Sequence, residues 1–197
     1  MRTFHDYKGI EVSGRVIYGL IQAFGLFKAL ASQLLLAERI GQAGPDGLII
    51  VEPESWYPFD AFMRAFDRTS EQLSDSVLHQ IGVTVGKTAE EPIPIKDMKT
   101  FAQVLDQGYH MHHRKNGRLM LDHSTGQVLE GIGHYRYREQ PDGTMEIETD
   151  NPYPCSFDKG LLFGGLRRVH AVGAILHDDS HQCRKRGKKS CVYVIKV

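Results

Sequence analysis

Hydrophobic residues in the first half of the chain recur three or four positions apart, which is the period of an amphipathic helix. The widest apolar face covers residues 14–40 and predicts one long helix, which Gly41 should end. Two shorter helices are expected at residues 58–67 and 70–85, and a fourth at residues 97–108. The first half of the protein is therefore expected to be mainly helical.

After Gly117 the period changes to two, and apolar and polar residues alternate as they do in half-buried strands. The segments expected to form strands are residues 118–123, 128–140, 144–150, 171–176 and 192–197. Pro141-Asp142-Gly143 is a turn signal between two of these segments, and a helix at residues 157–170 interrupts the series. Helices followed by an antiparallel sheet with one inserted helix predict an α+β protein.

The length of 197 residues is enough for one domain with a sizeable core. We expect a single domain over residues 1–197, with a mainly helical part at 1–92 and a helix, the antiparallel sheet and a metal site at 93–197. The 24 basic and 24 acidic residues cancel, so no net field favours nucleic acid. No stretch reaches the roughly 18 uninterrupted apolar residues of a membrane span. The charged start of the chain does not fit an export signal, and free cysteines are typical of the cytoplasm, where we expect the protein to be.

The end of the chain holds all three cysteines of the protein, Cys155, Cys183 and Cys191. Cys155 follows two prolines at the start of a predicted helix, and the other two flank a short basic loop before the last predicted strand. Thiols from a helix start and a short loop can converge on one point, as tetrahedral Zn²⁺ requires, so we predict a zinc site. Two alternatives stay open: three buried, inert cysteines, or a disulfide between Cys183 and Cys191.

A zinc site needs a fourth ligand and a balancing charge. His177, Asp178, Asp179 and His181 all lie close to Cys183 in the sequence, and we favour His181 or Asp179 as the ligand. The loop between the last two cysteines carries basic residues that would offset the charge of three thiolates. They are Arg184, Lys185, Arg186, Lys188 and Lys189. We favour this role over the alternative, in which the loop binds an anion or nucleic acid.

These features resemble the 4-vinyl reductase domain, a module that binds small ligands. The resemblance rests on the proline-flanked Cys155 before a helix, on Cys183 in a later loop, and on the C-x7-C spacing that leads to Cys191 and the last strand. The motifs NPYPC, YHMHHR and HDDSHQCRKRG are similar to those of an uncharacterised prokaryotic group of this class. Sensor domains of aromatic-responsive transcriptional activators share the arrangement and hold zinc with it. The resemblance implies that the three cysteines are thiol ligands, although Ser180 stands where those sensors supply a Glu.

An aromatic-rich cluster is predicted around the second helix. Its members are Trp56, Tyr57, Phe59, Phe62 and Phe66. Such a cluster is either hydrophobic core, the simpler interpretation of the pattern, or the wall of an apolar ligand pocket. The pocket hypothesis also includes His110, whose imidazole can hold a polar group of a ligand, and Tyr135 from the predicted hairpin.

Enzyme signatures are sparse, since the sequence has no Walker loop, nucleophile elbow or dinucleotide fingerprint. We therefore favour a binding module over an enzyme: a zinc-containing sensor for a small hydrophobic or aromatic ligand, which signals through a partner protein or a homodimer. An enzyme of tetrapyrrole metabolism is suggested only by the name of the family. The main alternative is a haem-based gas or redox sensor. It is motivated by the ten histidines and by the cluster of His110, His112 and His113. It is also motivated by the fold relationship of 4-vinyl reductase domains to haem-NO-binding and vesicle-tethering domains. The Tyr-x-Ser-x-Arg motif of haem-NO-binding domains is not evident, so the zinc sensor ranks first.

Overall fold

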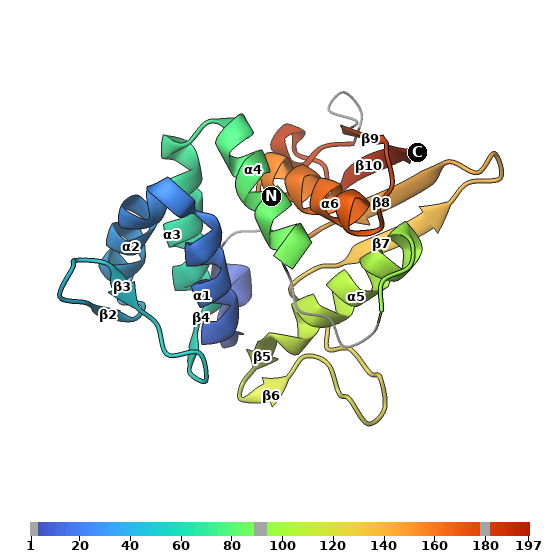
Figure 1. Ribbon diagram of the computed structural model, residues 1–197. Coiled ribbons are helices and arrows are strands. Elements are labelled where there is room, and N and C mark those ends of the chain that lie inside the picture. The colour runs from blue at the N-terminus through green and yellow to red at the C-terminus, as the bar shows by residue number, and fades with distance from the viewer. Residues whose placement is uncertain (1–3, 89–93, 178–181) are drawn as a thin grey trace. The chain divides into compact units, whose positions relative to one another are not determined.

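The computed structural model describes residues 4–88, 94–177 and 182–197. They form two compact units, which we describe separately (Figure 1). The N-terminal unit consists of Arg2–Ser74 and His110–Gly131, and the C-terminal unit consists of Asp75–Tyr109 and Ile132–Val197. This division differs from the expected one near residue 92, because the helix at residues 75–88 packs against the inserted helix of the C-terminal sheet.

The N-terminal unit combines a small antiparallel sheet with helices. Its helical elements are η1 (Phe4–Tyr7), α1 (Gly14–Ala23), η2 (Gly25–Phe27), α2 (Lys28–Ala37) and α3 (Phe59–Gln72). Its strands are β1 (Ile10–Ser13), β2 (Gln42–Ala43), β3 (Ile49–Ile50), β4 (Trp56–Pro58), β5 (His113–Lys115) and β6 (Arg118–Leu119). The main sheet has the order β4-β1-β5-β6, and Val12 of β1 lies opposite Tyr57 on one side and His113 on the other.

The long helix expected at residues 14–40 is two helices, which corrects that prediction. α1 and the η2–α2 segment are bent by 113° relative to each other. The break is at Gly25, whose φ of +55° lies in the left-handed region, which interrupts an α-helix and suits glycine. Within the described ranges no single helix is long and apolar enough to cross a membrane, and only this bent pair meets the criterion, by length and composition alone.

Aromatic rings fill the core of the N-terminal unit. Tyr7 and His113 meet the ring of Phe59 edge-on, with centroids 5.0 and 4.6 Å away. Phe62 and Phe66 continue this cluster along the buried face of α3, with ring centroids 6.1 Å apart. All five side chains are buried, so the unit is held by apolar and aromatic packing.

The C-terminal unit is an antiparallel sheet with helices. Its helical elements are α4 (Asp75–Thr88), α5 (Met98–Met111, of which the residues up to Tyr109 belong to this unit), α6 (Cys155–Arg168) and η3 (Arg184–Arg186). Its strands are β7 (Tyr135–Glu139), β8 (Met145–Thr149), β9 (Ala174–His177) and β10 (Cys191–Lys196). The order β7-β8-β10-β9, with α6 inserted between β8 and β9, agrees with the expected α+β layout. Residues 128–133 do not extend the sheet, because only Val128 forms a bridge, with Leu121.

Helices α4 and α6 lie side by side with their backbones in close contact (Figure 1). Gly82 and Gly86 of α4 meet Gly160 and Gly164 of α6. A Cβ added to Gly160 would lie 2.0 Å from the carbonyl oxygen of His79, so no other residue fits there without a shift. Gly82 and Gly86 lie inside α4, where the missing side chains allow α6 to approach.

Candidate metal centre

The three cysteines converge in the C-terminal unit. The Sγ atom of Cys155 lies 3.8 Å from that of Cys183 and 3.3 Å from that of Cys191. All three are buried and none is bridged to another, so the structure contradicts the disulfide alternative, which needs a sulfur–sulfur distance of about 2.05 Å. Two thiolates bound to one tetrahedral Zn²⁺ at about 2.3 Å would lie about 3.8 Å apart. The observed sulfur distances are therefore close to those that zinc requires.

Local structure brings each thiol to this point. Cys155 is the first residue of α6, and Cys191 is the first residue of β10, where it lies opposite Thr149 at the end of β8. Cys183 precedes the single turn η3. Gly187 ends that turn with a φ of +80°, a left-handed conformation that returns the chain toward β10. The turn therefore returns the backbone to the position from which Cys191 can meet Cys183.

His177 is the fourth candidate ligand. One ligand atom from each of Cys155, His177, Cys183 and Cys191 lies within 4.8 Å of the others. His177 ends β9 and lies opposite Tyr193 of β10, and the two rings stack with centroids 4.7 Å apart. Three thiols and one imidazole are a donor set typical of structural zinc sites.

The two ligands favoured from the sequence, Asp179 and His181, lie outside the described residues. His177 was considered as well but was not favoured, because spacing along a loop does not show which side chain turns inward. The register of β9 on β10 supplies that information, since it places His177 beside the strand that begins at Cys191.

Arg184 supplies positive charge next to the thiols. Its backbone N–H and its Nε donate to the Sγ of Cys191 at 3.3 and 3.2 Å. The pKa of Cys191 is lowered, first by the hydrogen bond from the Cys155 thiol and then by His177 and Arg184, against the effect of burial. The pKa of Cys155 is raised, first by the same hydrogen bond and then by burial.

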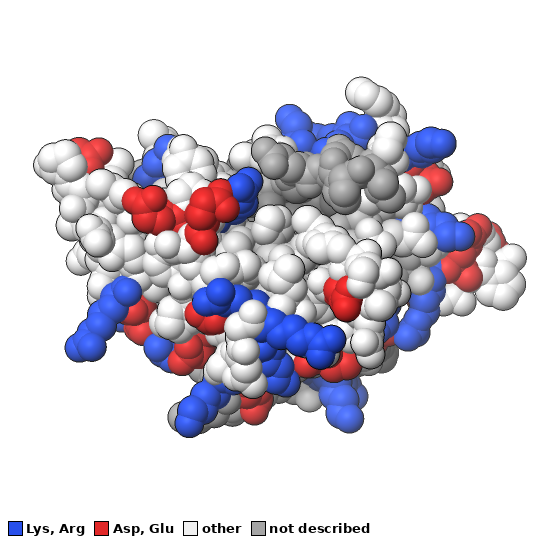
Figure 2. All heavy atoms as spheres, turned by 90° about the horizontal axis from the view of Figure 1, so that it is seen from below, with Lys and Arg blue, Asp and Glu red and all other residues white. Residues whose placement is uncertain are grey.

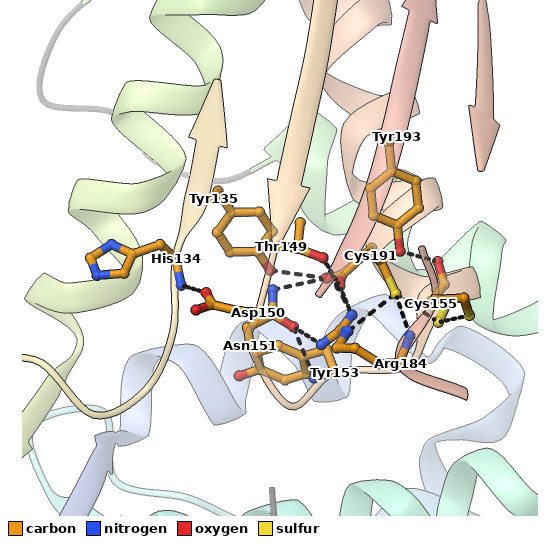
Figure 3. Close-up of polar contacts among 12 residues, drawn as sticks. His134, Tyr135, Thr149, Asp150, Asn151, Tyr153, Cys155, Arg184, Cys191 and Tyr193 are labelled. Atoms are coloured by element: carbon orange, nitrogen blue, oxygen red, sulfur yellow. Dashed lines mark hydrogen bonds and ion pairs between the residues drawn. The ribbon is translucent and has the colours of Figure 1, made fainter. Parts of the chain in front are cut away.

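The other end of the Arg184 side chain meets a buried carboxylate (Figure 3). Its Nη2 donates to Asp158 at 2.6 Å and its Nη1 donates to Asn151 at 2.9 Å. Asp158 also accepts hydrogen bonds from the hydroxyls of Tyr135 at 3.0 Å and Thr149 at 3.3 Å. The side chain of Asp158 has no exposed surface, and burial raises its pKa to about 6 although Arg184 opposes that shift. Arg184 thus connects the thiols to a buried polar network.

The outer part of the basic loop makes weaker contacts than Arg184 does. Lys185 lies 3.4 Å from Asp75, and both side chains are exposed, so this ion pair is a weak one. On the face that Figure 2 shows, basic and acidic residues are interspersed, as the formal net charge of zero suggests.

Tyr135 was expected to line a ligand pocket, but it is buried in the interior of the C-terminal unit. Its hydroxyl binds Asp158, and its ring meets that of Tyr109 edge-on at 5.8 Å. The hydroxyl of Tyr109 in turn donates to the carbonyl oxygen of Ile132 at 3.0 Å. Tyr135 therefore links strand β7 to helix α5.

The other aromatic residues proposed for a pocket lie in the N-terminal unit. Phe62 and Phe66 line an apolar cavity of about 10 Å³, and Trp56 lines a second cavity of about 140 Å³. Both are smaller than the roughly 300 Å³ of a typical small-molecule site. Phe59 is fully buried, and the Tyr57 hydroxyl accepts a hydrogen bond from a loop backbone N–H at 3.1 Å. Within this unit Phe59, Phe62 and Phe66 are core, which agrees with the simpler interpretation of the pattern. The pocket hypothesis stays a prediction.

The three neighbouring histidines have separate surroundings. His110 is buried in the last turn of α5. His112 shares a hydrogen bond of 3.1 Å with the hydroxyl of Ser13. His113 is buried in β5 against Phe59. His110 is thus the one that offers a buried imidazole from a helix.

Two acids were not singled out from the sequence, the buried Asp158 and the half-buried Asp106. Asp106 is hydrogen-bonded to the ring of His134 at 3.1 Å and accepts a hydrogen bond from the backbone N–H of Tyr135 at 2.8 Å. Both acids occupy helix positions that look solvated in a hydrophobic pattern. Asp106 binds His134 and Tyr135, and Asp158 binds Tyr135 and Arg184, all more than 20 residues away in sequence, so no local signal identifies these contacts.

Solved structures of haem-NO-binding (H-NOX) domains share this fold. An H-NOX protein from Shewanella oneidensis, in its Fe(II)NO state, has a TM-score of 0.58 and 15% identity over 93% of this chain and 98% of its own. A variant of the H-NOX protein of T. tengcongensis has a TM-score of 0.57 and 14% identity over 93% and 96% of the two chains. At such low identity the likeness defines the fold alone.

The sequence itself matches none of the established protein families and none of the proteins with curated descriptions. The expected fold relationship to haem-NO-binding domains is confirmed by the solved structures. Membership of the 4-vinyl reductase family stays a prediction.

Proposed function

We propose that this protein is a sensor domain that binds a small molecule and signals through a partner protein or a second copy of itself. The support is the H-NOX fold, shared over 93% of the chain with a protein that binds NO at Fe(II). A further structure with this fold concerns the way a protein distorts its porphyrin and modulates the haem redox potential. The fold neighbours thus favour haem over an unspecified hydrophobic ligand.

Haem binding is the first part of the proposal, and His110 is the residue best suited to hold the iron. It offers a buried imidazole at the end of α5, and imidazole is a common axial ligand of haem. When bound, the haem would supply a site for a diatomic gas. The propionate groups would need partners other than those of the H-NOX motif, because the sequence contains no Tyr-x-Ser-x-Arg and the Tyr135 hydroxyl is bound to Asp158.

Haem reconstitution tests this part. We expect the purified protein to develop a Soret band with one equivalent of haem, and His110→Ala to abolish or shift it. The exposed His123 provides the matched control, since His123→Ala should leave the band unchanged. If the wild-type protein gives no Soret band, the haem hypothesis is excluded. The remaining candidate is then a sensor for a hydrophobic or aromatic ligand, as the resemblance to 4-vinyl reductase domains implies.

A zinc ion that braces the C-terminal unit is the second part of the proposal. The observation that carries it is the convergence of Cys155, His177, Cys183 and Cys191, whose ligand atoms lie within 4.8 Å of one another. Four protein ligands leave no open position, so we assign the ion a structural role rather than a catalytic one. The two parts are independent, because haem and zinc would use different residues.

Elemental analysis tests the zinc site. We expect one zinc per wild-type chain, and a loss of that zinc in Cys183→Ser and in His177→Asn. His170→Asn is the matched control, because His170 is exposed, lies in the same unit, and has a φ of +54° that Asn tolerates. Equal zinc in His177→Asn and the wild type would show that another residue is the fourth ligand. A wild type without zinc would refute the site.

A further inference from the structure

The side chain of Arg184 is hydrogen-bonded both to the cysteine site and to the buried Asp158. Each of its three guanidinium nitrogens donates a hydrogen bond: Nε to the Sγ of Cys191, Nη1 to Asn151, and Nη2 to Asp158. Its side chain is only 12% exposed, and that of Asp158 is fully buried. A buried guanidinium in which every nitrogen is hydrogen-bonded is held in one geometry. Displacement of its Cys191 contact therefore disturbs its Asp158 contact as well.

The backbone of Arg184 is tied to the cysteines as well. It follows Cys183 directly in the chain, and its own N–H donates to the Sγ of Cys191. Whatever fixes the sulfurs of Cys183 and Cys191 therefore also fixes the point from which the Arg184 side chain starts. A metal ion on these sulfurs would do so, and this argument rests on the proposed zinc site.

Asp158 connects Arg184 to residues outside the cysteine site. Asp158 lies one turn after Cys155 on α6 and accepts the hydroxyl of Tyr135, the first residue of β7. The ring of Tyr135 contacts Tyr109 of α5. Figure 3 shows the continuous set of contacts from the sulfurs through Arg184 to Tyr135.

We propose that Arg184 is a positioning residue that makes the metal centre and the buried Asp158–Tyr135 pair depend on each other. With metal bound, Arg184 is held where it neutralises Asp158, and the Tyr135 contact of β7 is kept. When the metal leaves, the loop that carries Arg184 is released and Asp158 remains buried without its cation, which a protein interior does not tolerate. The contacts of β7 and α5 then weaken, so the metal state of the cysteines is transmitted to strand and helix positions that hold no ligand.

The first test measures zinc affinity by competition with a chromophoric chelator. Arg184→Gln should bind zinc about 10-fold or more weakly than the wild type, as is usual when a residue that supports the ligands is removed. Asp158→Asn should weaken zinc as well, although Asp158 is not among the four ligands. The double variant should lose little more than Arg184→Gln alone, because both changes break one connection. Arg186→Gln, an exposed arginine in the same turn, is the control and should bind like the wild type.

A second readout is independent of affinity and covers the case in which Arg184→Gln does not fold. Arg184→Lys keeps the charge but cannot bridge sulfur and carboxylate. In the Co²⁺-loaded protein it should shift the thiolate-to-cobalt charge-transfer band to lower energy, because an N–H···S bond is lost. In the wild type, chelation of zinc should speed amide hydrogen exchange about 10-fold at residues 135–139, as in local unfolding.

The outcomes separate the inference from the zinc site itself. A wild type that binds no zinc removes the site and the inference with it. Zinc affinity of Arg184→Gln and Asp158→Asn equal to that of Arg186→Gln overturns the inference and leaves the zinc site standing. The inference is also overturned if chelation speeds amide hydrogen exchange at residues 183–191 and leaves exchange at residues 135–139 unchanged.

Discussion

The two units of this protein are stabilised by different means. In the N-terminal unit the buried side chains around α3 are mostly apolar, and Phe59, Phe62 and Phe66 pack ring against ring. In the C-terminal unit the buried set includes a carboxylate, a guanidinium and three thiols, with Asp158 and Arg184 at its centre. An aromatic core needs nothing beyond the chain, because burial of apolar surface is favourable by itself.

A buried group of charges is different, since each member costs free energy unless all its partners are present. The stability of the C-terminal unit should therefore depend on what occupies the sulfurs and on the protonation of its acids. The stability of the N-terminal unit should be nearly independent of both.

Loss of a thiol should have the largest effect. Cys191→Ser should lose the proposed zinc and destabilise the protein by about 5 kcal/mol, in the range expected when a structural metal is lost. Denaturant unfolding with and without a chelator measures this. The chelator should lower the stability of the wild type and leave that of the variant unchanged. If chelation does not change the wild type, the contrast between the units has no metal component.

Truncation of the aromatic core should come next. Phe62→Ala should cost about 4 kcal/mol, because a fully buried ring is replaced by a cavity. Unlike the first effect, this loss should be the same with and without chelator, since Phe62 lies in the other unit and independent sites contribute additively to stability. A loss that changes with chelator would show that the two units are coupled.

The glycine contact between α4 and α6 should be less sensitive than the core. Gly160→Ala should cost about 2 kcal/mol, because its Cβ would lie 2.0 Å from the carbonyl oxygen of His79 and the helices must separate. Gly19→Ala is the matched control in helix α1 of the N-terminal unit, where a Cβ meets nothing within 4 Å. That change should stabilise the protein by about 0.5–1 kcal/mol. Thermal unfolding of both variants gives the comparison, and equal signs would contradict it.

The smallest effect should be a pH dependence at α4. The pKa of His79 is lowered, first by burial and then by the charge of Lys159. A histidine with a depressed folded pKa favours the neutral form, so its contribution to stability is present above pH 6.5 and is lost as pH falls through the folded pKa. His79→Gln should remove this part of the acid sensitivity, measured as the change in melting temperature between pH 7.5 and 5. The same acid sensitivity in variant and wild type would assign it to other groups.

Much of the fold follows from local patterns. The alternation around Tyr135 and the turn at Gly143 predict the β7-β8 hairpin, because a period of two and a turn are properties of a few neighbouring residues. The long helix at residues 14–40 was wrong for the converse reason. A glycine such as Gly25 inside an apolar helical pattern is tolerated in many helices, so the pattern does not reveal that this one bends the chain.

The candidate site divides in the same way. Cys155, Cys183 and Cys191 could be selected from the sequence, since thiols beside prolines and in a basic loop have few other roles. His177 could not be preferred over its neighbours, because the choice depends on how β9 pairs with β10. Tyr135 was assigned to a pocket because an inward-facing tyrosine does not show whether it meets a ligand or, as here, a buried Asp158.

By itself the sequence determined the helices after residue 58, the β7-β8 hairpin and the last strand, which residues carry sulfur, and that the charges balance, because periodicity, composition and side-chain chemistry are written residue by residue. Only the tertiary structure decided that helix α4 packs against α6, that His177 lies beside the thiols, and that Arg184 lies between Cys191 and Asp158. Those decisions belong to strand register and helix packing, where residues far apart in the chain meet.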